Sequence, residues 1–154
     1  RRRHTRLRTV TGVQTCALPI YYSPSADYIQ VPHAATFESA EAHACTTLHE
    51  LAHWTGHASR LARDLAGKFE RHAYAAEELV AELAAAFLAA DLGLEASPHP
   101  EHVNYLAAWL EVLKSDKRAI FTAASAASRA AAYLHSLQPG GAATPAEAES
   151  VSDA

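Results

Sequence analysis

Apolar side chains recur every three or four positions along several stretches of this chain, a spacing typical of amphipathic α-helices. In the clearest stretch, which is rich in alanine, Leu79, Leu83 and Phe87 share this spacing. Gly93 follows it and marks a helix end. The pattern predicts four helices, which run from Thr36 or Ser39 to about His57, from Tyr74 to Leu92, from Glu101 to about Leu113 and from about Lys117 to Leu137.

One short segment ahead of the first predicted helix is typical of a β-strand. The residues from Tyr28 to Val31 are aromatic or β-branched in all but one position, and Pro32 stops the run, as expected for a strand at a sheet edge. The residues from Tyr21 to Asp27 are turn-like, and those from Arg60 to Arg71 form a charged connection without a clear pattern. The sequence therefore predicts an α+β domain that is predominantly helical.

Charge is distributed unevenly along the 154 residues. The first 20 residues contain five arginines and no acid, whereas the remaining 134 hold eight basic and seventeen acidic side chains, a formal charge of −9. The sequence VTGVQTCALPI, at 10–20, resembles the in-frame translation of a sequencing-library adapter. We therefore interpret residues 1–20 as a non-native scar and expect the native chain to extend upstream of Tyr21.

The remainder has the size of one domain, and hydrophobic residues make up 49% of the whole chain, as in globular proteins. We place that domain at 21–137 and expect a disordered tail at 138–154, where small and polar residues dominate. No apolar run approaches the roughly 18 residues that a membrane-spanning helix needs. We therefore expect no membrane partner. Outside the first 20 residues acids outnumber bases about two to one, which argues against nucleic-acid binding by this segment itself.

The first predicted helix contains His49-Glu50-Leu51-Ala52-His53, the HExxH pattern. Residues four apart on a helix lie one turn apart on one face, so both imidazoles can bind a common metal ion. Zinc accepts histidine nitrogen readily. Glu50 is rotated by about 100° from His49 on the helix, and it can instead act as the general base that deprotonates a water molecule.

A catalytic zinc usually takes three protein ligands, and the second predicted helix offers carboxylates for the third. Glu78 and Glu82 are four residues apart and share a face, so one could bind the metal while the other hydrogen-bonds a ligand histidine. Glu77 is an alternative ligand. Small residues beside this face, Ala81 among them, would let the second helix pack closely against the first.

Other metal schemes fit the sequence less well. The metzincin pattern HExxHxxGxxH finds its glycine at Gly56 but has Ser59 in the final position, and the chain has no methionine for the associated turn. A three-histidine site that includes His57 remains possible. A di-iron bundle needs two Glu-x-x-His pairs, and we find one.

Four stretches in order resemble the zincin-like metallopeptidase domain of ArdC-type antirestriction proteins, which also occurs in TraC-like plasmid primases and in polyvalent mobile-element proteins. The resemblance spans about 21–137 and rests on TLHELAHWTGH, RLARDLAGKF, YAAEELVAELAAAFLAADLGL and YLAAWLEVLKSDKRAIFTAAS. It implies a gluzincin-type fold, Zn2+ bound by His49 and His53, Glu50 as the catalytic glutamate and a third ligand from the EELVAE segment. We assign that ligand to Glu78, with Glu82 behind a histidine.

The resemblance further implies a bacterial, cytoplasmic protein of a mobile element, whose single-stranded-DNA-binding domain would lie upstream. We expect a zinc metallopeptidase acting on a polypeptide substrate, held in extended form along Tyr28–Val31. One rival hypothesis is a catalytically silent, zinc-stabilised domain that binds a protein partner such as a restriction enzyme. The other is an acidic DNA mimic, which the charge of −9 suggests but the clustering of acids near the predicted metal disfavours.

Overall fold

The computed structural model describes residues 19–63, 71–95, 109–111, 113–114 and 116–139. Its elements in chain order are β1 (Tyr21–Ser23), β2 (Tyr28–Gln30), a 3-10 turn η1 (Ala34–Thr36), α1 (Ala40–Thr55), α2 (Arg71–Asp91) and α4 (Ala119–Ser136). The prediction of a mostly helical α+β domain is confirmed. In the described part of the chain, no helix is long and apolar enough to cross a membrane.

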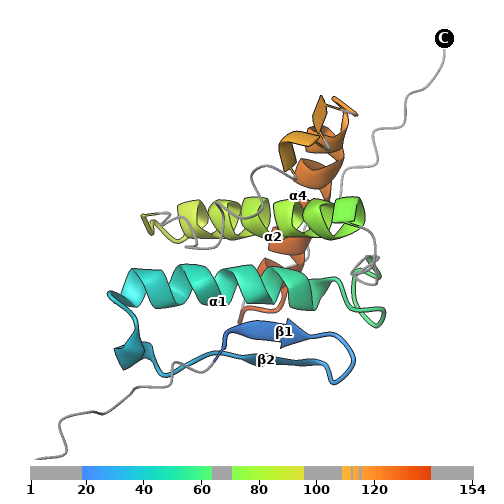
Figure 1. Ribbon diagram of the computed structural model, residues 1–154. Coiled ribbons are helices and arrows are strands. Elements are labelled where there is room, and N and C mark those ends of the chain that lie inside the picture. The colour runs from blue at the N-terminus through green and yellow to red at the C-terminus, as the bar shows by residue number, and fades with distance from the viewer. Residues whose placement is uncertain (1–18, 64–70, 96–108, 112, 115, 140–154) are drawn as a thin grey trace, which may run out of the picture.

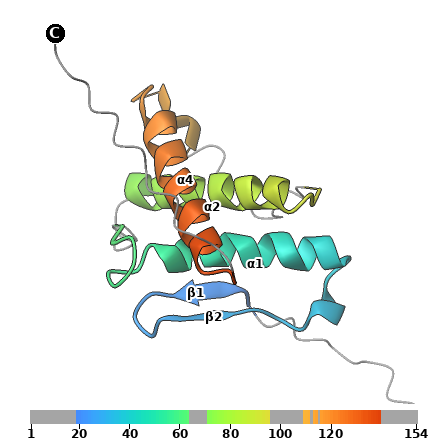
Figure 2. The same cartoon turned by 180° about the vertical axis from the view of Figure 1, so that it is seen from behind.

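Three helices and a hairpin make up the layers of the domain. Helices α1 and α2 lie side by side and run in opposite directions, while α4 crosses behind them and packs against both (Figures 1 and 2). The β1–β2 hairpin covers the side of α1 that faces away from α2 (Figure 1). Helix α1 is therefore enclosed between the hairpin and α2, so side chains on two of its faces are shielded from solvent.

The observed helix ends lie close to the predicted ones. Ser39 is the N-cap of α1, where its hydroxyl accepts a hydrogen bond from the backbone N–H of Ala42 at 3.0 Å, and Gly56 is its C-cap. Helix α2 begins three residues earlier than Tyr74, the predicted start, and Gly93 follows its end with a φ of +67°. The predicted third helix, Glu101–Leu113, falls largely outside the described residues.

The prediction of a turn over Tyr21–Asp27 is wrong for its first three residues. Tyr21, Tyr22 and Ser23 instead form β1, which pairs antiparallel with β2 in the register Tyr21↔Gln30, Tyr22↔Ile29, Ser23↔Tyr28. The turn is confined to 24–27 and closes through Asp27, whose φ is +51°. A three-residue strand is too short to show alternation in the sequence, and it becomes a strand here because a partner strand and α1 lie beside it.

The core is built mostly from alanine. Ala52 of α1, Ala81 and Ala84 of α2, and Ala127 and Ala130 of α4 have no exposed surface. Such small residues let helix axes approach closely, toward the lower end of the usual range of about 8–10 Å. The close packing of α2 on α1 that we predicted from Ala81 is therefore present, and it decides where the carboxylates of α2 lie.

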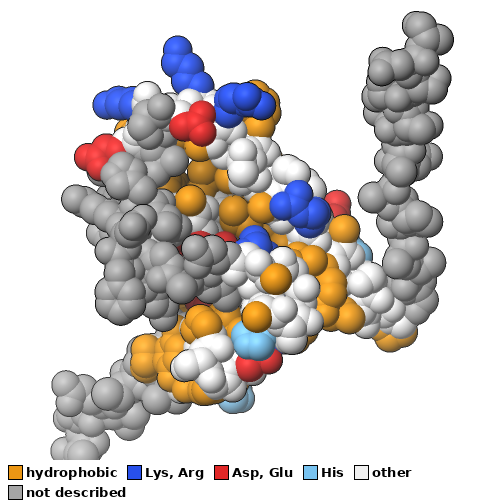
Figure 3. Space-filling model, turned by 90° about the vertical axis from the view of Figure 1, so that its right-hand side faces the viewer, with side chains coloured by type: hydrophobic (Ala, Val, Ile, Leu, Met, Phe, Trp, Pro, Cys, Tyr) orange, Lys and Arg blue, Asp and Glu red, His pale blue; other side chains and the backbone are white. Residues whose placement is uncertain are grey.

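On the face shown in Figure 3, hydrophobic side chains occupy the middle, and Lys and Arg gather at the upper end.

Candidate metal centre

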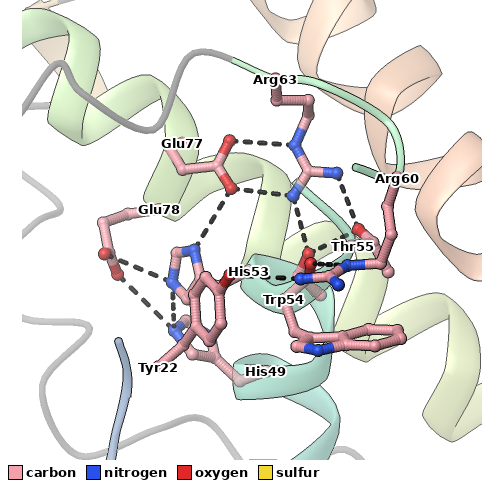
Figure 4. Close-up of polar contacts among 10 residues, drawn as sticks. Tyr22, His49, His53, Trp54, Thr55, Arg60, Arg63, Glu77 and Glu78 are labelled. Carbon is pink, nitrogen blue, oxygen red and sulfur yellow. Dashed lines mark hydrogen bonds and ion pairs between the residues drawn. The ribbon is translucent and has the colours of Figure 1, made fainter. Parts of the chain in front are cut away.

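The two histidines of the HExxH pattern lie on one buried face of α1. The Nε2 atoms of His49 and His53 are 3.2 Å apart, and their rings meet edge to face with centroids at 4.8 Å. Helix α2 brings Glu78 against this pair, with Oε2 at 3.6 Å from His49 Nε2 and Oε1 at 3.4 Å from His53 Nε2. Figure 4 shows the carboxylate and the two rings pointing toward one another.

The spacing of these three side chains fits a single small cation. Their ligand atoms all lie within 4.8 Å of one another. In a tetrahedral zinc site with bond lengths of 2.0–2.1 Å, neighbouring ligand atoms are about 3.3 Å apart. The two nitrogens, 3.2 Å apart, match that value, and each has one of the two Glu78 oxygens 3.4 or 3.6 Å away, so a small shift of the carboxylate would bring one oxygen into place. Two neutral imidazoles and one carboxylate also form a donor set that zinc accepts, so the residues present fit a divalent metal such as zinc.

A carboxylate also lies next to the Nδ1 atom of each histidine ring, the ring nitrogen that does not face Glu78. Glu82 Oε1 is 3.2 Å from His49 Nδ1, and Glu77 Oε1 is 3.2 Å from His53 Nδ1. Because an ionised carboxylate only accepts hydrogen bonds, His53 Nδ1 carries a proton that it donates to Glu77. The ion-pair contact with Glu82 favours a proton on His49 Nδ1 as well, so each Nε2 is left on the side of Glu78. Glu78 is thus the acid that stands between the two Nε2 atoms, whereas Glu77 and Glu82 stand behind the rings.

Charge in the cluster shifts the pKa values of its members. Burial by itself would lower the pKa of His49, but its hydrogen bonds to Glu78 and Glu82 outweigh that effect and raise the pKa to about 10. The pKa of His53 is also raised, because Glu77 and Glu78 outweigh its burial. The same contacts, working against burial, hold the pKa of Glu78 well below its usual range. Without a metal, the centre is therefore a network of ion pairs.

Glu50 lies in α1 beside this centre but on the side of the hairpin. Its side chain is buried, and burial is the main reason why its pKa is raised. The Tyr22 backbone in β1 and both histidines are near enough to favour the charged carboxylate and so lower the pKa in part. The strand nearest Glu50 is thus β1, and the expectation that a substrate is held in extended form along Tyr28–Val31, which includes β2, stays a prediction.

A cluster of contacts around Arg60, which we call the latch, connects the hairpin to the end of α1. The Arg60 guanidinium pairs with the Asp27 carboxylate, donates to the Tyr22 hydroxyl at 3.2 Å and stacks 3.8 Å over the Trp54 ring. Its Nε donates to the Trp54 carbonyl at 2.6 Å. Arg60 holds the pKa of Asp27 down to about 2, and burial is the main cause that raises the pKa of Tyr22 to about 12. The latch keeps β1 against Glu50.

Sequence reasoning missed Arg60, Arg63, Tyr22 and Asp27. The two arginines lie in the connection for which we predicted no structure. Their partners outside α1 are Glu77, Asp27 and Tyr22, which are between 14 and 38 residues away along the chain. No spacing rule could have paired them. The alternative three-histidine site is not what the described residues form, since His57 Nδ1 instead contacts the Ser59 hydroxyl at 2.8 Å.

An HExxH helix, a glutamate from a second helix and a strand beside the general-base candidate are together typical of zincins, a class of metallopeptidases. The chain belongs to the zincin-like metallopeptidase family, whose sequence model matches residues 6–126. Among individual relatives, it is 48% identical over 118 residues to the protein y4eC of Sinorhizobium fredii, and 45% identical over 109 residues to the DNA primase TraC of Escherichia coli.

The similarity extends to solved structures. The metal-free structure of the antirestriction protein ArdC from plasmid R388 superposes with a TM-score of 0.69 at 45% identity, covering 77% of this chain and 42% of ArdC. Its Mn(II)-bound structure gives 0.69 at 46% identity, covering 75% and 43%. The matched region is 77% of this chain but 38% of y4eC, and 71% of this chain but 10% of TraC. The chain is thus similar to one part of each relative.

Proposed function

We propose that this domain is a zinc metallopeptidase of an antirestriction-type protein of a mobile element, with His49, His53 and Glu78 as metal ligands and Glu50 as general base. The observation that carries the proposal is the convergence of both Nε2 atoms and the Glu78 carboxylate at separations suited to one tetrahedral ion, next to a buried glutamate. The zincin-like family and the fact that ArdC has a Mn(II)-bound structure support the binding of a divalent metal.

When bound, a zinc ion would supply a Lewis acid that polarises a carbonyl group and makes water a better nucleophile. The residues of the chain then divide the remaining work. Glu82 and Glu77 hold the Nδ1 protons of the two ligand histidines, so that both Nε2 lone pairs face inward. Glu50, whose pKa is raised by burial, takes a proton from the attacking water and returns it to the leaving amine.

The hairpin fixes the position of that base. The Tyr22 backbone in β1 lies near the Glu50 carboxylate and favours its charged form, the form that accepts a proton from water. An antirestriction role would place the domain in the cytoplasm of a bacterium that carries or receives the element, with a polypeptide as substrate or protein partner. Contact with nucleic acid would come from a single-stranded-DNA-binding domain upstream.

Hydrolysis can be tested with a proteome-derived peptide library, zinc-loaded protein and mass spectrometry of the products. We expect the wild-type chain to cleave, Glu50→Gln to retain zinc but lose cleavage, and the exposed control Glu95→Gln to behave as wild type. Cleavage by Glu50→Gln at the wild-type rate would reject the assigned base. A wild-type chain that binds zinc and cleaves nothing would favour the second candidate, a silent zinc-stabilised domain that binds a protein partner.

A further inference from the structure

Arg63 is a largely buried arginine that the proposed hydrolysis does not use. It lies a few residues beyond the end of α1, and 12% of its side chain is exposed. Its Nη2 donates to the Ala52 carbonyl at 2.7 Å, and its Nη1 donates to the Thr55 hydroxyl at 2.8 Å. These contacts fold the chain back onto the last turn of α1.

The same guanidinium grips Glu77 of α2 with two hydrogen bonds. Nε donates to Oε2 at 3.1 Å, and Nη2 donates to Oε1 at 2.8 Å, which is the bidentate arrangement that a planar guanidinium makes with a carboxylate. Oε1 is also the atom that accepts from His53 Nδ1 at 3.2 Å. The chain of contacts from Arg63 through Glu77 to His53 is visible in Figure 4.

We propose that Arg63 is a positioning residue for the metal centre, which acts through Glu77 to hold the His53 ring with Nε2 toward Glu78 and so raises affinity for a divalent metal. The inference rests on the proposed metal site. Because Arg63 binds both carboxylate oxygens, Glu77 cannot rotate about its terminal bond without losing one of these hydrogen bonds. The histidine that donates to Glu77 is therefore held in one tautomer and one orientation before the metal binds.

A purely structural role for Arg63 makes a different prediction. Its contacts with Ala52 and Thr55 brace the end of α1, and loss of that brace would lower stability whether or not Glu77 is present. A positioning role requires that the effect on metal affinity pass through Glu77. The two roles are separated by a double-mutant cycle between Arg63 and Glu77, with metal affinity as the readout.

The experiment measures zinc affinity of the full chain by competition with a chromophoric chelator, with the visible spectrum of bound Co(II) as a report on ligand geometry. We expect Arg63→Met and Glu77→Gln each to weaken zinc binding by about 10- to 100-fold. The double variant should bind zinc as tightly as the single variant that has the lower zinc affinity. Thr55→Val removes one bracing contact but spares Glu77, so it should lower stability and leave zinc affinity unchanged. Arg129→Met is the surface control, since Arg129 bonds only Ser125 of its own helix among the contacts described.

Wild-type affinity in Arg63→Met, or additive losses in the double variant, would overturn the positioning role while leaving the metal site intact. A wild-type chain that binds no zinc would overturn the metal site and this role together. If Arg63→Met does not fold, as judged by circular dichroism, Arg63→Lys decides the question. Lysine keeps the charge but lacks the bidentate fork, so weaker zinc binding supports the role and unchanged binding rejects it.

Discussion

Ala81 of α2 tests whether close packing of two helices creates the metal centre. It lies one turn after Glu77 and three residues after Glu78, on a surface of α2 with no exposure to solvent, and it shares a buried cluster with Ala52 of α1. Replacement by leucine adds three carbon atoms where the two helices are packed through alanine. We expect Ala81→Leu to force α2 away from α1 and so separate Glu78 from both histidines.

The size of the effect follows from the packing distances. Helices that meet through alanine lie near the lower end of the 8–10 Å range of axial separations, and a leucine moves them by about 1 Å or more toward the upper end. The Glu78 oxygens, now 3.4 and 3.6 Å from the histidine nitrogens, would then lie about 4.5 Å away, beyond the roughly 3.3 Å that one zinc ion requires. Overpacking itself should lower the free energy of unfolding by about 1–3 kcal/mol.

Two measurements on the same samples separate the displacement of Glu78 from the loss of stability by overpacking. Zinc affinity reports the first, and denaturant unfolding in the presence of a chelator reports the second. Ala123→Leu is the matched control, because Ala123 belongs to the same buried cluster but lies on α4, which contributes no residue to the metal centre. Both variants should lose similar stability, whereas zinc affinity should fall by more than about tenfold in Ala81→Leu alone. A destabilised Ala81→Leu with wild-type affinity would refute the idea that this contact sets the ligand geometry.

Two further predictions concern the hairpin and the charge network. Arg60→Met removes the latch, so deuterium exchange at the Tyr22 amide should accelerate by about tenfold or more. The amide of Ala127 in α4 should stay protected and serves as the control. Unchanged exchange at Tyr22 would show that the latch does not hold β1. In the metal-free protein, the raised pKa of His49 adds stability that is full below the unfolded value of 6.5 and is lost as the pH rises toward about 10. The lowered pKa of Glu78 adds stability that is present above 4.5 and is lost as the pH falls. Urea unfolding of the metal-free protein, measured in a chelator, should therefore show the greatest stability between about pH 4.5 and 6.5. Zinc should move this optimum to higher pH, because the metal competes with protons for the histidines. A metal-free protein whose stability keeps rising above pH 6.5 would contradict this ion-pair network.

The sequence predicted the parts of the centre that depend on helical spacing alone. His49 and His53 share a face because they are four residues apart, and the same rule placed Glu78 and Glu82 on one side of α2. Of the two predicted starts of α1, Ser39 is the one that caps the helix, through a purely local hydrogen bond. Each of these inferences needs only the geometry of one helix.

The parts that escaped prediction depend on contacts between distant segments. Helical spacing alone could not decide which of Glu77, Glu78 and Glu82 faces the histidine Nε2 atoms, because that depends on the rotation of α2 against α1; the assignment to Glu78 came from the family resemblance. Arg63 follows α1 without a helical register, and its role appears only once α2 supplies Glu77. Short strand β1 likewise depends on β2 and α1 for its pairing.

Metal stoichiometry and affinity of the full chain, compared between wild type and Glu78→Ala, test the central claim most directly. Glu95→Ala, a change at an exposed glutamate, serves as the control. We predict a single tightly bound zinc ion in the wild type and in the control, and a loss of affinity of more than about 100-fold in Glu78→Ala, because an ion held by two imidazoles alone lacks its only charged ligand. A wild type without zinc, or a Glu78→Ala protein that binds zinc as tightly as the wild type, would contradict the proposed centre.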